Sequence, residues 1–205
     1  MNTTSEIPLA DQRTAEILAS ARLAFAEKGF DGASMQDLAR KAGMSVGNFY
    51  RYFPSKAAIV DALIALDLAE IEQDFAHILC DPDPIKALRA TIAQRISNSD
   101  CQEDGRIWAE ISAAALRKQE IGEAAFRMEA EIASHLVTIF ARASGLGFDK
   151  AAALWTAHAQ LVVMLVKSCA MRPPEPASSN DLTQLVMRMI NGLLDDITTF
   201  DAAKG

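Results

Sequence analysis

The sequence predicts an all-α protein, and three observations support this fold class. Half of the 205 residues are hydrophobic, whereas aromatic residues make up only 6%. Glycine (10 residues) and proline (7) are sparse. No segment alternates Val, Ile or Thr with polar residues as a half-buried β-strand does. A chain of this length and apolar content can bury a sizeable core, so we expect a folded, helical protein.

The N-terminal segment is expected to begin with a flexible arm followed by one helix. Residues 1–10 are largely polar and show no periodicity. From Asp11 to Lys28, apolar residues recur three and four positions apart, as they do on one face of a helix. Gly29 follows a cation, which is a common way for a helix to end. The first helix is therefore expected over 11–28.

Two shorter helices are expected next, with a tight turn between them. Ser34, with Asp37 three positions later, matches a capping box and predicts the start of the second helix. Gly43 can take the positive φ of a sharp reversal without steric strain, so it is expected to end that helix. Ser45 then caps a third helix over 46–53. Two short helices joined by a turn of about four residues form a helix-turn-helix pattern.

The rest of the chain is expected to form six longer helices. Ser55 follows Pro54 and is expected to cap a helix that runs to about Leu79. Pro82 and Pro84 end it, because each removes a backbone donor and restricts the residue before it. Further helices are expected near 84–97, 104–118, 120–143, 149–171 and 180–200, with breaks at Asn98–Gly105, Lys118–Glu120, Ser144–Gly147 and Arg172–Asn180.

Charge is unevenly distributed along the chain. The net charge is -7, but residues 1–60 hold seven basic and six acidic side chains. Within 34–60, four are basic and one is acidic. A locally basic module on an acidic body suits contact with a polyanion at one end of the molecule only.

Cysteine usage and hydropathy indicate a reducing, non-membrane setting. Cys80, Cys101 and Cys169 are odd in number and widely spaced, so they do not form a disulfide framework, and a cytoplasmic protein is expected. A redox switch through one of these thiols stays open. The N-terminus lacks the basic and apolar regions of a signal peptide. Residues 151–166 are uncharged but shorter than the ~20 residues that cross a bilayer, so we interpret them as a buried helix.

The start of the third helix carries small residues. A bare first helical turn allows the backbone to approach base edges in the major groove of DNA. Its hydroxyl and amide groups can contact bases, while helix N-termini and basic side chains can bind phosphates. The residues concerned are Ser45, Val46, Gly47 and Asn48.

These residues belong to a longer stretch that resembles a known family. The run GFDGASMQDLARKAGMSVGNFYRYFPSKAAIVDAL, residues 29–63, resembles the DNA-binding domain of the TetR/AcrR family of bacterial one-component transcriptional regulators, and the match extends over about residues 13–63. The resemblance implies a helix-turn-helix DNA-binding domain over 11–55. It also implies a helical-bundle ligand-binding and dimerisation domain over 56–205.

The resemblance also implies individual roles in binding a double-stranded DNA operator. Phe49 and Phe53 match internal anchors of the motif, whereas Arg51 can face either DNA or solvent. Positions implied to contact bases are Gln36, Val46, Gly47 and Asn48, and positions implied to bind phosphates are Ser45, Tyr50, Tyr52 and Lys56.

By the same analogy, the larger domain binds a small-molecule effector and forms a homodimer through its last two helices. The final helix has an apolar stripe wide enough to bury two faces. A dimer also suits a palindromic operator, because adjacent half-sites lie ~34–36 Å apart. The candidate effector-binding residues are apolar side chains with a few polar groups: Phe75, Ile92, Ile96, Trp108, Ile111, Met128, His135, Trp155 and His158.

Catalytic and metal-binding functions find little support in the sequence. His77 and Cys80 are three residues apart, and Glu131 and His135 four apart, but neither pair has a third ligand at a recognised zinc spacing. No phosphate-binding glycine loop or nucleophile elbow is present, so no catalytic residue, metal or cofactor is expected. The expected function is that of a ligand-responsive repressor. An activator, a helical enzyme and a ligand-independent DNA-binding protein stay open as alternatives.

Overall fold

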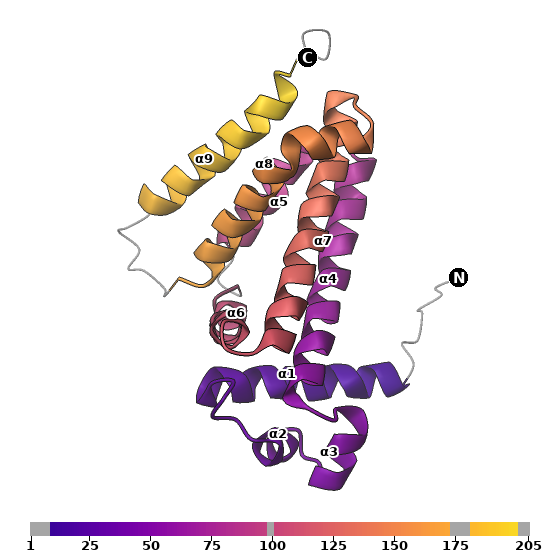
Figure 1. The fold of residues 1–205 in the computed structure, drawn as a ribbon, viewed down its shortest axis with the longest axis vertical. Helices are drawn as coiled ribbons and strands as arrows, with labels where there is room; N and C mark the ends of the chain where they lie inside the picture. The colour runs from indigo at the N-terminus through magenta and orange to yellow at the C-terminus, as the bar shows by residue number, and fades with distance from the viewer. Residues whose placement is uncertain (1–8, 98–100, 173–180, 201–205) are drawn as a thin grey trace, which may run out of the picture. The chain divides into compact units, whose positions relative to one another are not determined.

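A computed structural model of the chain describes residues 9–97, 101–172 and 181–200 (Figure 1). Over these residues it contains nine α-helices and no β-strand, so the all-α prediction is confirmed. The helices are α1 (Leu9–Lys28), α2 (Met35–Lys41), α3 (Val46–Tyr52), α4 (Lys56–Cys80), α5 (Pro84–Ser97), α6 (Cys101–Ala115), α7 (Gln119–Ser144), α8 (Phe148–Ala170) and α9 (Asp181–Thr198).

The helix boundaries near the N-terminus arise from the capping residues that the sequence predicts. Ser34 Oγ accepts a hydrogen bond from the backbone N–H of Asp37 at 3.1 Å, and Asp37 Oδ2 accepts one from the Ser34 N–H at 3.1 Å. Ser45 Oγ accepts from the N–H of Asn48 at 3.3 Å. Gly29 and Gly43 have φ values of 74° and 64°, which favour glycine. The capping box and both turns are thus confirmed.

Two expected boundaries differ from the structure. Helix α1 begins at Leu9, so the helix includes two residues expected in the arm, while residues 1–8 lie outside the described part of the chain. The expected break over Asn98–Gly105 is also too long, because α6 already begins at Cys101 and includes Gly105. A Cβ atom at Gly105 would lie 1.9 Å from the carbonyl oxygen of Ala170. This glycine permits a close approach of backbone and does not end a helix.

The chain divides into two compact units. Unit 1 comprises residues 1–65 and 106–124, and unit 2 comprises residues 66–105 and 125–205. Helix α4 contributes to both, since its first ten residues belong to unit 1. Residues 106–124 pack with the N-terminal helices, which the sequence pattern does not reveal. The functional boundary expected at residue 55 stays a prediction.

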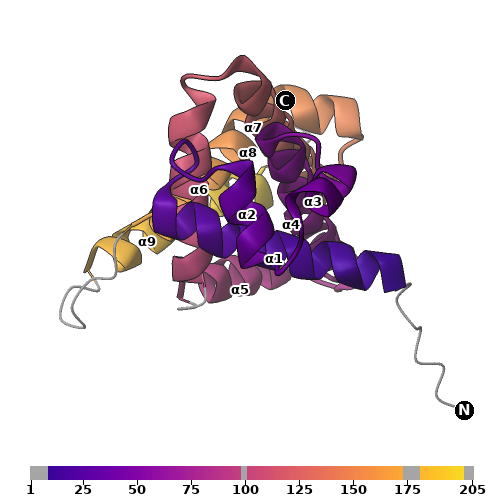
Figure 2. The same cartoon turned by 90° about the horizontal axis from the view of Figure 1, so that it is seen from below.

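Unit 1 has its own apolar core beneath α1, α2 and α3, which Figure 2 shows together. The rings of Phe25 and Phe30 lie 5.3 Å apart between their centroids, and both side chains are buried. Leu38 of α2 and Phe49 of α3 are fully buried as well. Burial of a large apolar side chain contributes about 1.5–3 kcal/mol, so these residues fix how α2 and α3 pack.

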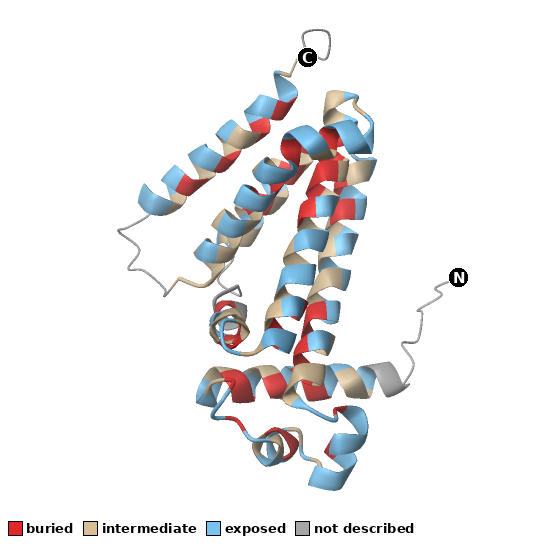
Figure 3. Ribbon diagram, viewed as in Figure 1, coloured by how far each residue is buried: buried red, intermediate tan, exposed pale blue. Residues whose placement is uncertain are grey.

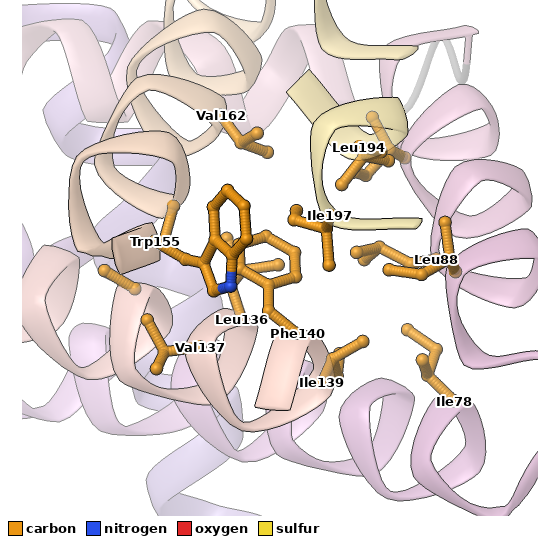
Figure 4. Packing of buried hydrophobic residues seen from close by; sticks show 14 of the residues in the cluster. Ile78, Leu88, Leu136, Val137, Ile139, Phe140, Trp155, Val162, Leu194 and Ile197 are labelled. Atoms are coloured by element: carbon orange, nitrogen blue, oxygen red, sulfur yellow. The ribbon is translucent and has the colours of Figure 1, made fainter. Parts of the chain in front are cut away.

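Unit 2 has a second core built from helices far apart in the sequence. Helices α5, α8 and α9 contact one another. The indole of Trp155 lies beside Leu136 and Phe140 of α7, and Ile197 of α9 lies near them (Figure 4). Figure 3 shows the buried positions of α9 as a stripe along one side of the helix, which is the amphipathic pattern expected from its sequence.

Helix α8 is only partly buried, so its interpretation as a buried helix needs correction. Ala151, Trp155, Ala159 and Val162 are buried in unit 2. The opposite side exposes apolar residues, including Met164 at 61%. Among the described helices, α8 alone is long and apolar enough to cross a membrane by length and composition. A helix that packs in a protein core passes the same test, and we interpret α8 as a bundle helix with one uncovered apolar face.

Candidate nucleic-acid interface

Helix α3 has one face in the core of unit 1 and one face in solvent (Figure 3). Phe49 and Phe53 are 0% and 5% exposed, and their ring centroids lie 6.1 Å apart. They are one helical turn apart, which explains why both point inward and confirms them as anchors. Val46, Tyr50 and Tyr52 are exposed by 37–47% on the remaining surface of the helix. Exposed large side chains that gather on one face of a helix can mark a contact surface.

The first turn of α3 is open. Gly47 has no atom within 4 Å of the position that a Cβ would occupy, and Ser45 and Asn48 are exposed. The Ser45 hydroxyl oxygen caps the helix, which leaves its O–H free to donate to another acceptor. Backbone N–H groups of the first helical turn lack partners within the helix and favour anions. This end of α3 can therefore approach a phosphate or a base edge closely.

Helix α2 presents a smaller polar surface. Gln36, which the resemblance implies to contact a base, is exposed. Exposure is what such a contact requires. Lys41 Nζ lies 2.6 Å from Glu27 Oε1, and Arg40 lies 3.6 Å from the carboxylate of Asp37. These two cations already have carboxylate partners. Arg51 of α3 is exposed, and no carboxylate partner is seen for it among the described residues.

Lys56 differs from the other predicted phosphate contacts, because its ammonium group turns into the protein. Its Nζ donates hydrogen bonds to the carbonyl oxygens of Phe30 at 2.6 Å, Ala33 at 3.1 Å and Asp31 at 3.3 Å. It also lies 4.8 Å from the centroid of the Phe30 ring. Burial lowers the pKa of Lys56, and the charge of Asp31 partly offsets this effect. All three ammonium donors are thus used within unit 1.

The loop that receives Lys56, residues 29–33, is also held by residues far away in the sequence. Glu110 Oε2 accepts a hydrogen bond from the N–H of Phe30 at 3.1 Å. Asp31 pairs with Arg117 at 2.7 Å and with Lys118 at 3.4 Å. The hydrogen bond from Arg117 is the main reason why the pKa of Asp31 lies below its usual range. The sequence gives no signal for these contacts, because they join segments some 80 residues apart.

Asp37 connects the capping box to helix α1. Its Oδ1 lies 2.6 Å from Lys28 Nζ, and Oδ2 accepts from both the hydroxyl and the N–H of Ser34. The Lys28 ammonium, followed by the Ser34 hydrogen bonds, holds the pKa of Asp37 far below its usual range. The carboxylate therefore stays ionised in neutral and mildly acidic solution.

The candidate effector-binding residues do not all fall in one unit. Trp108 and Ile111 belong to unit 1, where Ile111 is buried. The other seven belong to unit 2: Phe75, Ile92 and Trp155 are buried, whereas Ile96, Met128, His135 and His158 are partly exposed. Whether any of them contacts an effector stays a prediction.

Trp155 is the most informative of these candidates. The side chain is 6% exposed, and its Nε1 is the one buried side-chain polar atom without a hydrogen-bond partner in the described part of the chain. The ring meets those of His158 and Phe200 edge-on, at centroid distances of 5.1 and 5.4 Å. His158 in turn lies 3.4 Å from the carboxylate of Asp196. A buried donor without a partner costs about 1–3 kcal/mol and could be satisfied by an acceptor on a bound molecule.

Comparison with known proteins places this interface in a family context. Residues 17–63 match the family model described as bacterial regulatory proteins, tetR family. The chain is 38% identical over 87 residues to the HTH-type transcriptional regulator EthR of Mycolicibacterium smegmatis, a match that spans 42% of this chain and 40% of EthR. The matched region thus spans less than half the length of the curated relatives.

Solved structures extend the likeness to the whole fold. Salmonella enterica GusR has a TM-score of 0.72 and 25% identity, and the match covers 95% of this chain and all of GusR. AibR, in a complex with isovaleryl coenzyme A and operator DNA, has a TM-score of 0.61 at 18% identity, with 89% of this chain and 98% of AibR covered.

The exposed, capped second helix of the helix-turn-helix, together with the likeness to named transcriptional regulators, places the chain in the class of DNA-binding transcriptional regulators. The match over α1 to α4 and the likeness to GusR identify the family more closely. Residues 17–63 belong to the tetR family of bacterial regulatory proteins, and the fold of the chain is similar to that of GusR.

Proposed function

We propose that the chain is a ligand-responsive transcriptional repressor that binds a palindromic operator as a homodimer. A small molecule that binds unit 2 releases it from the operator. The observation that supports this most directly is the exposed face of α3, where Val46, Tyr50 and Tyr52 are uncovered around the open position Gly47. Such a regulator acts where the chromosome lies, so we expect a cytoplasmic protein.

On the DNA, we propose that the first turn of α3 contacts bases together with Gln36. The hydroxyl groups of Ser45, Tyr50 and Tyr52 would donate to phosphates, and Arg51 is added as a further phosphate contact because it is exposed. Lys56 is better supported as a residue that positions the loop 29–33. Direct contact with phosphate would require its ammonium to leave carbonyl oxygens at 2.6 and 3.1 Å.

We propose that the homodimer forms through α8 and α9. The two helices contact each other within one chain, and each leaves apolar side chains uncovered on another face. Exposed apolar residues on two adjacent helices suit a self-complementary interface between two copies of the chain. The residues are Leu154, Leu161 and Met164 of α8 and Leu182, Leu185 and Met189 of α9, all exposed by 37–61%.

We propose that the effector binds among the apolar residues of unit 2 and places a hydrogen-bond acceptor against Trp155 Nε1. AibR, which shares the fold, was solved with isovaleryl coenzyme A, so an acyl-coenzyme A is a sensible first probe. In Trp155→Phe, the apolar contact would remain while the donor is lost. We expect isovaleryl-coenzyme A, or the compound that a screen identifies, to bind about 2- to 12-fold more weakly, in line with the net value of one hydrogen bond.

The proposed mechanism uses helices that are shared between the two units. Helix α4 starts with Lys56 at the loop 29–33 and continues into unit 2, and Glu110 and Arg117 hold the same loop. An effector that moves these helices by a small amount would move α2 and α3 and change the separation of the two recognition helices in the dimer. A switch from 1:99 to 99:1 requires an effector preference of about 5.5 kcal/mol for the released state.

The test is to select genomic fragments that the full-length protein binds, followed by mobility-shift titration on the recovered site. Tyr50→Phe and Arg51→Ala should weaken operator binding, with the Arg51 change lowering the salt dependence by about one ion. Arg106→Ala, an exposed arginine of α6, is the control and should bind normally. Unchanged affinity in both α3 variants would refute the proposed contacts.

The same experiment separates the alternatives. A ligand-independent DNA-binding protein would bind the operator equally in the presence of every compound that binds the chain. A helical enzyme would yield no enriched fragments. An activator would bind the operator but raise transcription from the adjacent promoter, which a reporter assay measures.

A further inference from the structure

Three potential metal ligands, Glu72, Glu131 and His135, meet on the surface of unit 2. Glu131 and His135 are four residues apart on α7, so they occupy one face of that helix. The sequence offers no third ligand, but the structure places Glu72 of α4 beside them. Figure 1 shows α4 running alongside α7. One ligand atom from each of the three residues lies within 4.8 Å of the other two.

We propose that Glu72, Glu131 and His135 form a binding site for a divalent transition-metal ion such as Zn²⁺. Two carboxylates and a neutral imidazole supply two negative charges and three donor atoms. Imidazole favours Zn²⁺, Cu²⁺, Ni²⁺ and Fe²⁺ over Mg²⁺ and Ca²⁺, which prefer oxygen ligands alone. Three protein ligands leave a further coordination position for water or a bound molecule.

The geometry requires only small adjustments. Ligand atoms around a tetrahedral Zn²⁺ lie about 3.4 Å apart, given bonds of roughly 2.0–2.2 Å. His135 Nε2 now lies 4.0 Å from Glu72 Oε1. The two glutamates are exposed, so rotation of their side chains can close the remaining gap without disturbing the core.

The imidazole is already oriented by its surroundings. The ring of His135 stacks on that of Phe75, with 5.1 Å between centroids and 22° between planes. Phe75 is itself buried, which fixes the platform on which the imidazole lies. A ligand whose ring plane is fixed before binding loses less conformational entropy when the ion arrives. Because Glu72 lies on α4 and the other two ligands lie on α7, a bound ion would connect these two helices.

The same contacts would also suit a protonated His135 paired with the two carboxylates and no metal. That arrangement predicts no Zn²⁺ binding at these residues. The exposed pair His77 and Cys80 on α4 is a rival zinc ligand set, because the two are three residues apart. An experiment must separate these three cases.

The test measures Zn²⁺ affinity of the metal-free full chain by competition with a chromophoric chelator. Wild type should bind one Zn²⁺, and its Tm should rise with added Zn²⁺ because the ion binds the folded state. Glu72→Gln, Glu131→Gln and His135→Phe should each weaken binding by at least about tenfold. The His135 variant keeps an aromatic ring on Phe75. Circular dichroism before metal addition checks that every variant is folded.

The controls are Glu70→Gln, an exposed glutamate two residues from Glu72, and the double variant His77→Gln/Cys80→Ser. Both should bind Zn²⁺ as wild type does. The proposal is overturned if wild type binds no Zn²⁺ or if fewer than all three ligand variants lose affinity. It is equally overturned if the loss appears in the His77/Cys80 variant.

Discussion

The ammonium nitrogen of Lys56 donates a hydrogen bond of 2.6 Å to the carbonyl oxygen of Phe30 and lies 4.8 Å from the centroid of the same residue's ring. One cation therefore satisfies a loop carbonyl and contacts the aromatic face that anchors this loop in the core of unit 1. Charged hydrogen bonds and cation–π contacts are both stronger when partly shielded from water. The first residue of α4 thus sets the conformation of the segment that leads into α2.

Lys56→Met tests whether this residue acts through the loop or through DNA. The substitution retains most of the apolar stem but removes all donors. We expect a loss of about 1–2 kcal/mol in the free energy of unfolding, because carbonyl oxygens of the loop lose a charged partner. Operator affinity should also fall, with little change in its dependence on salt.

Urea unfolding and mobility shifts at several salt concentrations measure the two effects. If Lys56 instead bound phosphate, the salt slope would drop by about 0.9 ion. Arg51→Met serves as the comparison, since this exposed arginine should show the reverse pattern: normal stability and a reduced slope.

Gly47→Ala should separate stability from DNA binding. No atom lies within 4 Å of the added Cβ, and alanine is favoured over glycine in a helix by up to about 1 kcal/mol. We expect the protein to become slightly more stable. Operator affinity should fall by about tenfold or more, because the methyl group stands where α3 would approach the DNA.

Gly147→Ala is the control, since its Cβ position before α8 is equally open. It should bind the operator normally, although alanine is a poorer N-cap than glycine. Unchanged affinity in Gly47→Ala would mean that DNA does not approach this turn closely.

Local signals made the helices predictable from the sequence, whereas the contacts between distant segments could not be predicted. Ser34, Gly43 and Ser45 each act within three or four residues, so the pattern fixed the ends of α2 and α3. The close approach of Gly105 in α6 to the backbone of Ala170 joins distant segments of the chain, which no local pattern reports.

The interface shows the same division. The inward Phe49 and the outward Tyr50 follow from helical periodicity. The orientation of Lys56 depends on the carbonyl groups of a loop 23 to 26 residues away. The prediction that Lys56 binds phosphate therefore depends on contacts that the sequence does not show.

Asp37 should make unit 1 sensitive to acid. Its pKa is lowered in the folded chain, chiefly by Lys28, so the carboxylate stabilises the fold at neutral pH. This contribution is fully present above the unfolded value near 4 and declines as pH falls below it. Asp31, whose pKa is lowered by Arg117, adds to the same trend.

The measurement is Tm between pH 7 and pH 2.5 for wild type and Asp37→Asn. The variant should be less stable at pH 7, and its Tm should fall less between pH 4 and pH 2.5. Parallel curves for the two proteins would show that Asp37 does not carry this dependence.

The exposed faces of α8 and α9 should decide the oligomeric state. Met164 and Met189 are 61% and 48% exposed in the single chain, so replacing both with Glu should leave the fold intact. In a two-fold symmetric dimer each substitution appears twice, and four carboxylates would become buried without partners. We expect the dissociation constant of the dimer to rise by at least about 100-fold, which corresponds to about 2.7 kcal/mol.

Sedimentation velocity measures the dissociation constant of the dimer. The control is Leu116→Glu, at a residue that follows α6 and is 90% exposed. Operator binding should fall together with dimerisation, because a monomer contacts only one half-site. A double variant that stays dimeric would place the interface elsewhere.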